Sequence, residues 1–170
     1  MKKSPWIVFC VAVLFAGLSW QMPAFGASTN AVYSLTSESV FKVGKLKVDQ
    51  SHAATAVFLS DGTCSLNVGT NVFSGTYAVS KSGKQATLTP DVNGLAAIKS
   101  NVVALISAQV SAGVTISVKS VKFSKIVRKK GALFAMDTVS GKGCEGKKCR
   151  GFSLKTQWTN WTLVSGTNII

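Results

Sequence analysis

Two cysteines that lie close together are the residues best placed for covalent chemistry in this sequence. Cys144 and Cys149 are separated by the polar, glycine-containing stretch 145–148, so a disulfide between them would close a small loop at little geometric cost. Cys64 is the remaining cysteine beyond residue 26, so three cysteines are expected to form one disulfide and leave one free thiol. We therefore predict a Cys144–Cys149 bridge. The alternative is that Cys64 bridges to either of them across the fold.

The three cysteines could instead bind a zinc ion. His52 is the only histidine that could join them. The four residues lack the paired spacing of ligands that structural zinc sites show. We expect no metal and no cofactor.

Catalytic side chains are scarce. His52 has Asp49 and Ser51 nearby, but their spacing does not assemble a catalytic triad, and the chain has no nucleophile elbow and no glycine-rich phosphate loop. The acidic residues are scattered, and Asp61 and Asp91 have turn or cap positions: Glu38, Asp49, Asp61, Asp91, Asp137 and Glu145. We predict that the protein is not an enzyme, with an unpaired Cys64 thiol as the one reactive alternative.

Basic residues gather in two places. Such runs attract phosphate, anionic lipid or acidic polysaccharide, although nothing here is specific for nucleic acid. Successive turns of a meander lie at opposite ends of a sheet, so we expect two separate patches. The alternative is that both are solvated loops. The candidate anion-binding residues are Arg128, Lys129 and Lys130 at one turn, and Lys142, Lys147, Lys148 and Arg150 around the cysteine loop.

Residues 1–26 have the three parts of a secretory signal. Lys2 and Lys3 precede an apolar run, and Pro23 and small residues follow it. The apolar run is shorter than the roughly 20 residues that span a bilayer, although an uncleaved anchor is the alternative. Cleavage after Gly26 removes two lysines and no acid, so the net charge falls from +13 to +11. We expect an exported protein, periplasmic or extracellular, whose residues 27–170 form a single β-rich domain.

The elements that must position these residues are mostly strands. Short apolar or alternating runs with turn residues between them extend from 31 to 89. The segment 40–48 is predicted as one strand whose alternation slips at a bulge near Gly44. Asp61 and Gly62 predict a tight hairpin between strands at 54–59 and 63–68.

The meander continues after that hairpin. Strands are predicted at 72–79 and 85–89, and Gly75 within the first of them indicates a bend or a close backbone approach. Beyond the helix, 114–127 is predicted as one long strand bent by a bulge near Ser120. A strand at 132–139 and a last strand, or pair of strands, at 152–164 follow, on either side of the cysteine loop.

One helix is predicted in the middle of the chain. Pro90 stops the preceding strand, and Asp91 or Asn93 can cap a helix that runs to about Ser111. Lys99 is the only charge in the whole predicted helix, so we expect much of the helix surface to be covered, by the sheet or by a partner. Its apolar stripe, at three- and four-residue spacing, consists of Leu95, Ile98, Val102, Leu105, Ile106 and Gln109.

Trp158 and Trp161 lie three residues apart in the last strand region. In a regular strand, residues three apart face opposite sides. One indole is then expected in the core and the other on the surface, where it could stack on a sugar ring or a base.

The meander resembles small lipocalin-like barrels over about half the chain, on Phe58, the 61–63 turn, Gly75 and Tyr77. The chain departs from that pattern because it has no Gly-x-Trp signature near its first mature strand and because its helix lies mid-chain. The expected fold class therefore rests on the strand pattern. It is a mostly β protein, an antiparallel meander curled into a small barrel of about eight strands with one mid-chain helix packed on it.

Two functions fit this architecture. The first is a non-enzymatic module that binds a small apolar ligand inside the barrel, although the same side chains could simply fill the core. The second is an envelope-associated protein that binds an anionic surface or a protein partner through the basic loops or the uncharged helix. The expected pocket-lining residues are Phe58, Phe73, Tyr77, Phe123 and Phe134.

Overall fold

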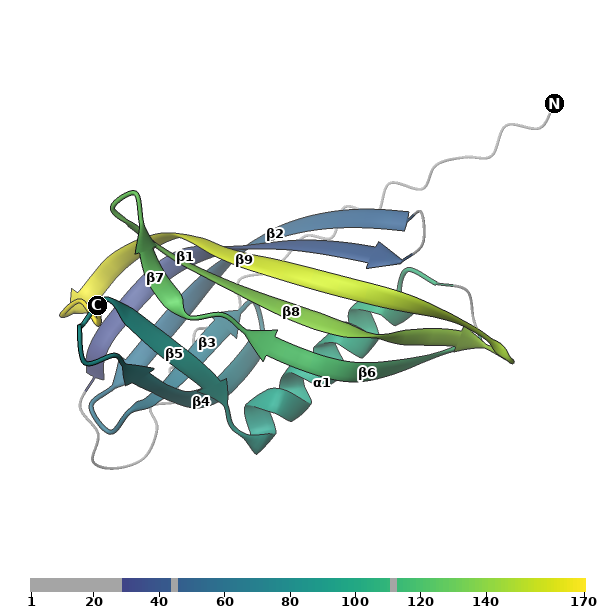
Figure 1. Cartoon of the computed structure of the whole chain (residues 1–170), viewed down its shortest axis with the longest axis horizontal. Coiled ribbons are helices and arrows are strands. Elements are labelled where there is room, and N and C mark those ends of the chain that lie inside the picture. The colour runs from purple at the N-terminus through teal and green to yellow at the C-terminus, as the bar shows by residue number, and fades with distance from the viewer. Residues whose placement is uncertain (1–28, 44–45, 111–112) are drawn as a thin grey trace.

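The structure, a computed structural model, describes residues 29–43, 46–110 and 113–170 (Figure 1). The expected secretory signal lies outside the described residues. The helix is α1 (Val92–Ser107). The strands are β1 (Thr29–Val43), β2 (Leu46–Leu59), β3 (Thr63–Val68), β4 (Asn71–Val79), β5 (Gln85–Pro90), β6 (Val114–Phe123), β7 (Ile126–Lys129), β8 (Ala132–Glu145) and β9 (Lys148–Gly166).

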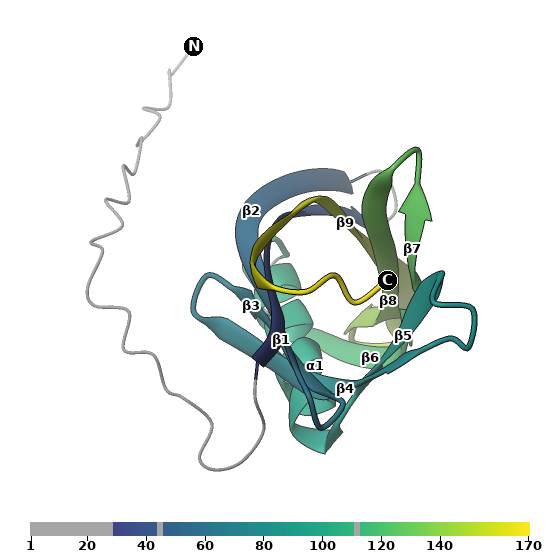
Figure 2. The same cartoon turned by 90° about the vertical axis from the view of Figure 1, so that its left-hand side faces the viewer.

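The strands close into an antiparallel barrel. Neighbours run in the order β8-β7-β5-β4-β3-β2-β1-β9, and β9 pairs back onto β8, which completes a ring of eight strands. β6 is the extra strand outside this ring and pairs with residues 137–145 of β8. The predicted fold class, a mostly β barrel with one mid-chain helix packed on it, is confirmed. Figure 2, turned by 90° from Figure 1, shows the ring of strands around the interior.

The barrel is closed along only part of its axis. Within the described residues, β3 pairs with β2 from Ala54 to Phe58, and residues 46–53 of β2 extend beyond it. In this half, β2, β1, β9, β8 and β6 form a curved sheet that is open between β2 and β6. α1 packs against β4 and β6 on the concave side of that sheet (Figures 1 and 2).

The first predicted strand is wrong in one respect. β1 ends at Val43, β2 begins at Leu46, and these two residues pair in an antiparallel ladder. The expected bulge at Gly44 lies outside the described residues, but the segments on either side of it are two strands. The slip in alternation therefore marks a reversal of the chain.

The hairpin at Asp61 and Gly62 is confirmed. Gly62 has a φ of 84°, and the Asp61 carboxylate accepts hydrogen bonds from the backbone N–H and the hydroxyl of Thr63 at 2.8 and 2.6 Å. The close approach expected at Gly75 is also found, because a Cβ there would lie 2.4 Å from the carbonyl oxygen of Thr89.

The long strand predicted at 114–127 is divided in two. The expected bulge is present, since the register shifts between Val118 and Ser120. The strand then stops at Phe123, and β7 pairs with a different part of β8. At the break, the backbone N–H of Ser124 donates to the carbonyl oxygen of Met136, and the hydroxyl of Ser124 accepts from the backbone N–H of Met136, each at 2.6 Å.

α1 begins where the sequence predicts and ends earlier. The Asp91 carboxylate caps it by accepting from the Gly94 N–H at 2.7 Å and from the Ser74 hydroxyl at 2.9 Å. The last helical residue is Ser107, not Ser111. The sheet covers one side of α1, where Gly94, Ile98, Val102 and Ile106 are buried, and leaves Ala96 and Ser100 on the outer side exposed. Cover by a partner stays a prediction.

The core consists of two clusters. One fills the complete part of the barrel around Tyr33, Phe58 and Ile126, and Ile169 packs against it near the end of the chain. The Ile169 N–H donates to the Tyr33 hydroxyl at 3.0 Å, which holds the terminal segment across that end of the barrel (Figure 2). The other cluster lies between α1 and the curved sheet and includes Phe41, Ile98, Val102, Ile106 and Val139.

Candidate ligand-binding cavity

A cavity of about 570 Å³ lies where the two core clusters meet. Its walls come from α1 on one side and from the inner face of the sheet on the other. Twenty-one residues line it: Ser37, Ser39, Gln50, His52, Leu66, Val68, Gly69, Thr70, Asn71, Phe73, Ile98, Asn101, Val102, Ala104, Leu105, Phe123, Asp137, Val139, Leu154, Thr156 and Trp158.

Burial distinguishes the floor of the cavity from its mouth. The lining residues of β8 and β9, such as Val139 and Leu154, are buried. His52, Thr70 and Ala104 also line the cavity and are exposed. The mouth therefore lies between the part of β2 that extends beyond β3, the β3–β4 turn and α1, and the floor lies on β8 and β9.

A hydrogen-bonded carboxyl stands on the floor. The side chain of Asp137 is 7% exposed, and its Oδ1 accepts a hydrogen bond of 2.8 Å from the indole N–H of Trp158. Burial raises the pKa of Asp137 to about 7, against the opposing effect of the Trp158 hydrogen bond. This group therefore changes its charge near neutral pH.

Hydroxyl groups line the wall beside this carboxyl. Ser39 on β1 and Thr156 on β9 share a hydrogen bond of 3.0 Å. Thr156 pairs with Asp137 in the β8–β9 ladder, so this hydroxyl pair lies next to the carboxyl. An apolar wall with a few converging polar groups is the usual composition of a small-molecule site.

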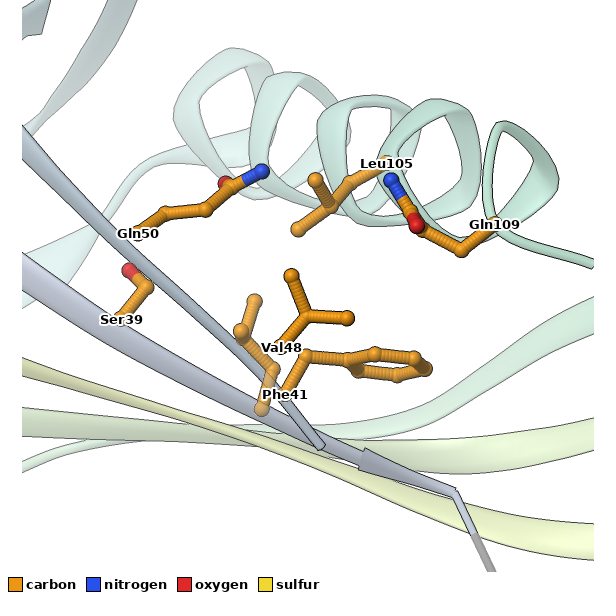
Figure 3. A pocket seen from close by; sticks show the side chains of 7 residues that line it. Ser39, Phe41, Val48, Gln50, Leu105 and Gln109 are labelled. Carbon is orange, nitrogen blue, oxygen red and sulfur yellow. The ribbon is translucent and has the colours of Figure 1, made fainter. Parts of the chain in front are cut away.

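Beyond Leu105 and Leu154 the cavity narrows into a crevice between α1 and the β1–β2 hairpin. Figure 3 shows Leu105 of α1 and Gln109, just beyond the end of α1, opposite Phe41 and Val48, with Gln50 at one side. This crevice has no room for a water molecule. A ligand would therefore occupy the wider space above the floor.

The structure brings only part of the predicted aromatic set to the cavity. Phe73 and Phe123 line it. Phe58 is fully buried in the packed cluster, with the Tyr77 ring at 5.0 Å between centroids. Phe134 does not face the interior, and Lys129 Nζ lies 4.1 Å from its ring centre. Its place in the strand explains the error, because Leu133 and Ala135 on either side of it are the residues that point inward.

The same alternation contains the signal for Asp137, which sequence reasoning grouped with the scattered acids. Leu133, Ala135, Asp137 and Val139 share one face of β8, and all are buried. A carboxyl within an apolar stripe of a strand is the pattern that could have identified it, because a buried charge is costly unless it has a role or a partner.

The sequence predicted that Trp158 and Trp161 face opposite sides of their strand, and this prediction is wrong. Trp158 is buried, and Trp161 packs against the same core cluster and donates to the Trp158 carbonyl at 2.9 Å. Asn160 between them has a φ of 55°, and the β1–β9 register shifts at this point by one extra residue of β9. This bulge changes the alternation, so both indoles lie on the inner side.

The basic residues form two separate groups, as expected. Lys129 and Lys130 are at the β7–β8 turn, and Lys147 and Lys148 are at the tip of the β8–β9 hairpin, at the other end of β8 (Figure 1). Arg128 bonds the backbone carbonyls of Gly131 and Ile170 at 3.1 and 2.7 Å. Lys142 and Arg150 are exposed near the hairpin tip.

The predicted disulfide is confirmed. Cys144 and Cys149 are bonded and face each other directly across the β8–β9 ladder, so the expected cysteine loop is the end of a paired hairpin. Cys64 is free and half-buried, and burial raises the pKa of its thiol to about 11. Such a thiol holds little thiolate at neutral pH.

No cluster of three or more metal-ligating side chains occurs within the described part of the chain. The described residues also contain no helix long and apolar enough to cross a membrane. Comparisons with protein-family models, with curated proteins and with solved structures find no match for this sequence.

Proposed function

We propose that this protein is an exported, non-enzymatic binding protein that holds a small, mostly apolar molecule in the cavity between α1 and the curved sheet. The observation that carries the proposal is the cavity itself. Its volume of about 570 Å³ falls in the range of known small-molecule sites, roughly 300–1,000 Å³. Val102, Leu66 and Phe73 supply apolar surface, and a few polar groups are positioned to orient a ligand.

The construction of the walls favours a preformed site. The floor strands β8 and β9 are paired along their whole shared length, from Ala135 to Glu145. α1 is fixed at its start by the Asp91 cap and by the contact of Gly94 with the Ser74 backbone. A cavity with rigid walls loses little conformational entropy when it binds a ligand.

Binding is favoured over catalysis because the ionisable groups of the lining are placed far apart in the architecture. Asp137 stands on the floor and bonds an indole, whereas His52 lies at the exposed mouth. The Cys64 thiol is outside the lining, and its pKa is raised to about 11. A nucleophile is activated by a base within hydrogen-bond reach of it, and the described lining residues contain no such pair.

Export is supported by two features of the chain. The first is the charged, then apolar, then small-residue order of the leader at residues 1–26. The second is the Cys144–Cys149 disulfide, because such bonds persist in oxidising compartments outside the cytosol.

The test is binding of the neutral fluorophore N-phenyl-1-naphthylamine to the purified protein, with the dye excited directly. Ala104 is exposed at the mouth, and an Ala104→Trp change places a large side chain across it. We expect saturable binding that is unchanged in high salt and that the variant weakens about tenfold or more, equivalent to about 1.4 kcal/mol.

The matched control is Ala96→Trp, which adds the same side chain to the exposed outer side of the same helix. This control should bind the dye as the wild type does. Equal binding by both variants, or binding that disappears in high salt, would contradict a site in the cavity, since a neutral dye held by apolar contacts is insensitive to screening.

A further inference from the structure

We propose that the molecule held in the cavity is an organic cation, a protonated amine on an apolar body, with the amine paired to the carboxylate of Asp137. This inference rests on the proposed function and names the ligand class of the same site.

The charge of the cavity lining is opposite in sign to the charge of the chain as a whole. The whole chain has 19 lysines and arginines against 6 acidic residues. Yet none of the 21 lining residues is a lysine or an arginine, and one of them is an aspartate. In so basic a protein, a cavity without basic residues and with a carboxyl at its floor has a charge bias opposite to that of the chain. This bias favours a cation and disfavours a carboxylate or phosphate ligand.

The Asp137 carboxyl forms no ion pair with any described residue. The ion pair found within the described residues joins Lys47 and Asp49, both exposed, and does not involve Asp137. Asp137 therefore has the indole N–H of Trp158 and the Thr156 hydroxyl as hydrogen-bonding neighbours, and it forms no ion pair with any described residue. A buried carboxylate is stable only when it is paired, so an incoming ammonium group would supply the charge that the floor lacks.

The cavity residues around the Asp137 carboxyl are almost all uncharged. The elements around the cavity present uncharged groups to it: Ser37 and Ser39 from β1, Asn101 and Val102 from α1, Phe123 from β6 and Thr156 and Trp158 from β9. His52 of β2 is the only other titratable side chain of the lining, and it lies at the exposed mouth. Lys99 of α1 is exposed and is not part of the lining. Asp137 alone therefore sets the charge of the floor.

The experiment compares three ligands that differ only in the head group: decylamine, decanol and decanoate, each displacing N-phenyl-1-naphthylamine from the full protein. At about pH 8 the amine is protonated. We expect the amine to bind about tenfold or more tighter than the alcohol, and the carboxylate to bind most weakly. Asp137→Asn, which keeps the size of the side chain, should reduce the affinity for the amine to that for the alcohol measured in the same variant.

A second measurement does not depend on the variant folding. In the wild type, the preference for the amine over the alcohol should decrease as the pH falls from about 8 to about 5, because the Asp137 carboxylate becomes protonated. A carboxylate ligand that binds as tightly as the amine, or an amine preference that survives in Asp137→Asn, would overturn the inference.

The two proposals fail in different ways. If the dye and decanol bind and the amine has no advantage, the cation is wrong and the cavity site remains. If neither the dye nor any of the three ligands binds, the proposed function itself is wrong.

Discussion

Trp158 on β9 donates its indole N–H to the carboxyl of Asp137 on β8, at 2.8 Å, across a diagonal of the ladder in which Trp158 lies opposite Ala135 and Asp137 lies opposite Thr156. This contact places the buried carboxyl of the cavity at the N–H edge of the indole ring. It also makes the charge of the floor dependent on pH and on one neighbouring side chain.

The stability of the protein should fall as the pH rises from about 4 to about 7. Burial raises the pKa of Asp137 from the ordinary 3.8 to about 7, so between these values the native state binds a proton that the unfolded state has released. The stabilisation is complete below about pH 4 and is lost above about pH 7. We expect the free energy of unfolding to fall by on the order of 4 kcal/mol across this window, as measured by urea denaturation.

The control for this prediction is Asp137→Asn, whose side chain does not titrate. Its unfolding free energy should be nearly constant over the same window. Asp61 and Asp91, whose hydrogen bonds with Thr63 and with Gly94 lower their pKa below 3.8, lose their stabilising effect only at more acidic pH. A wild-type profile that rises from pH 4 to 7 would contradict a buried, protonated Asp137.

Trp158→Phe should destabilise the protein in a pH-dependent way. The change removes the donor to Asp137 and raises the pKa of that carboxyl further, because the Trp158 hydrogen bond lowers it. The expected loss is about 1.5–3 kcal/mol above pH 7, where the carboxylate is ionised, and less near pH 5. Denaturation of wild type and variant at the two pH values measures it.

Trp161→Phe is the matched comparison. Trp161 donates to the backbone carbonyl of Trp158, which does not titrate. Its removal should therefore cost the same at both pH values. A loss with the same pH dependence in both variants would mean that the indole of Trp158 has no special relation to Asp137.

Gly94→Ala should loosen the helix that forms one wall of the cavity. A Cβ at Gly94 would lie 1.9 Å from the carbonyl oxygen of Ser74, and backbone atoms on β4 cannot yield as a side chain can. The strain, about 1–3 kcal/mol, should exceed the gain of about 1 kcal/mol that alanine brings to a helix interior. Thermal unfolding and amide exchange within α1 would show it. Ser100→Ala, on the exposed side of the same helix, should change stability by less than about 0.5 kcal/mol.

Replacing Cys144 and Cys149 by serine should have a local effect. The bridge closes a very short loop at the end of a hairpin that is already paired, so its loss should cost about 2 kcal/mol. Amide exchange should increase near the hairpin tip, from about 143 to 150, while dye binding stays as in the wild type. Unfolding of the whole domain on this double change would show that the hairpin tip supports the core.

The features that the sequence predicted correctly are those encoded locally. The Asp61–Gly62 turn needs only the left-handed φ of Gly62, and the cysteine bridge needs only a short separation. The start of α1 follows from Asp91 as a cap. Each of these depends on residues within a few positions of one another, so spacing was sufficient.

The features that it missed depend on partners far along the chain. A slip in alternation is compatible with a bulge or with a reversal, and only the pairing of Val43 with Leu46 decides for the reversal. The bulge at Asn160, which brings Trp158 and Trp161 to one side, is specified by the β1–β9 register. The alternation of β8 could have marked Asp137 as a buried residue, but its place on the cavity floor depends on the pairing of β8 with β9 beneath α1, which no local pattern predicts.

A two-dimensional amide and indole NMR titration of the protein with decanol tests the cavity site most directly. We expect the Trp158 indole N–H and the amides of Asn101 and Thr156 to shift saturably, because these residues line the cavity. The amides of Gly131 and Gly146, at opposite ends of β8, should stay in place. Shifts confined to the two turns, or no shift at the Trp158 indole when the ligand is in excess, would contradict a ligand-binding cavity in this protein.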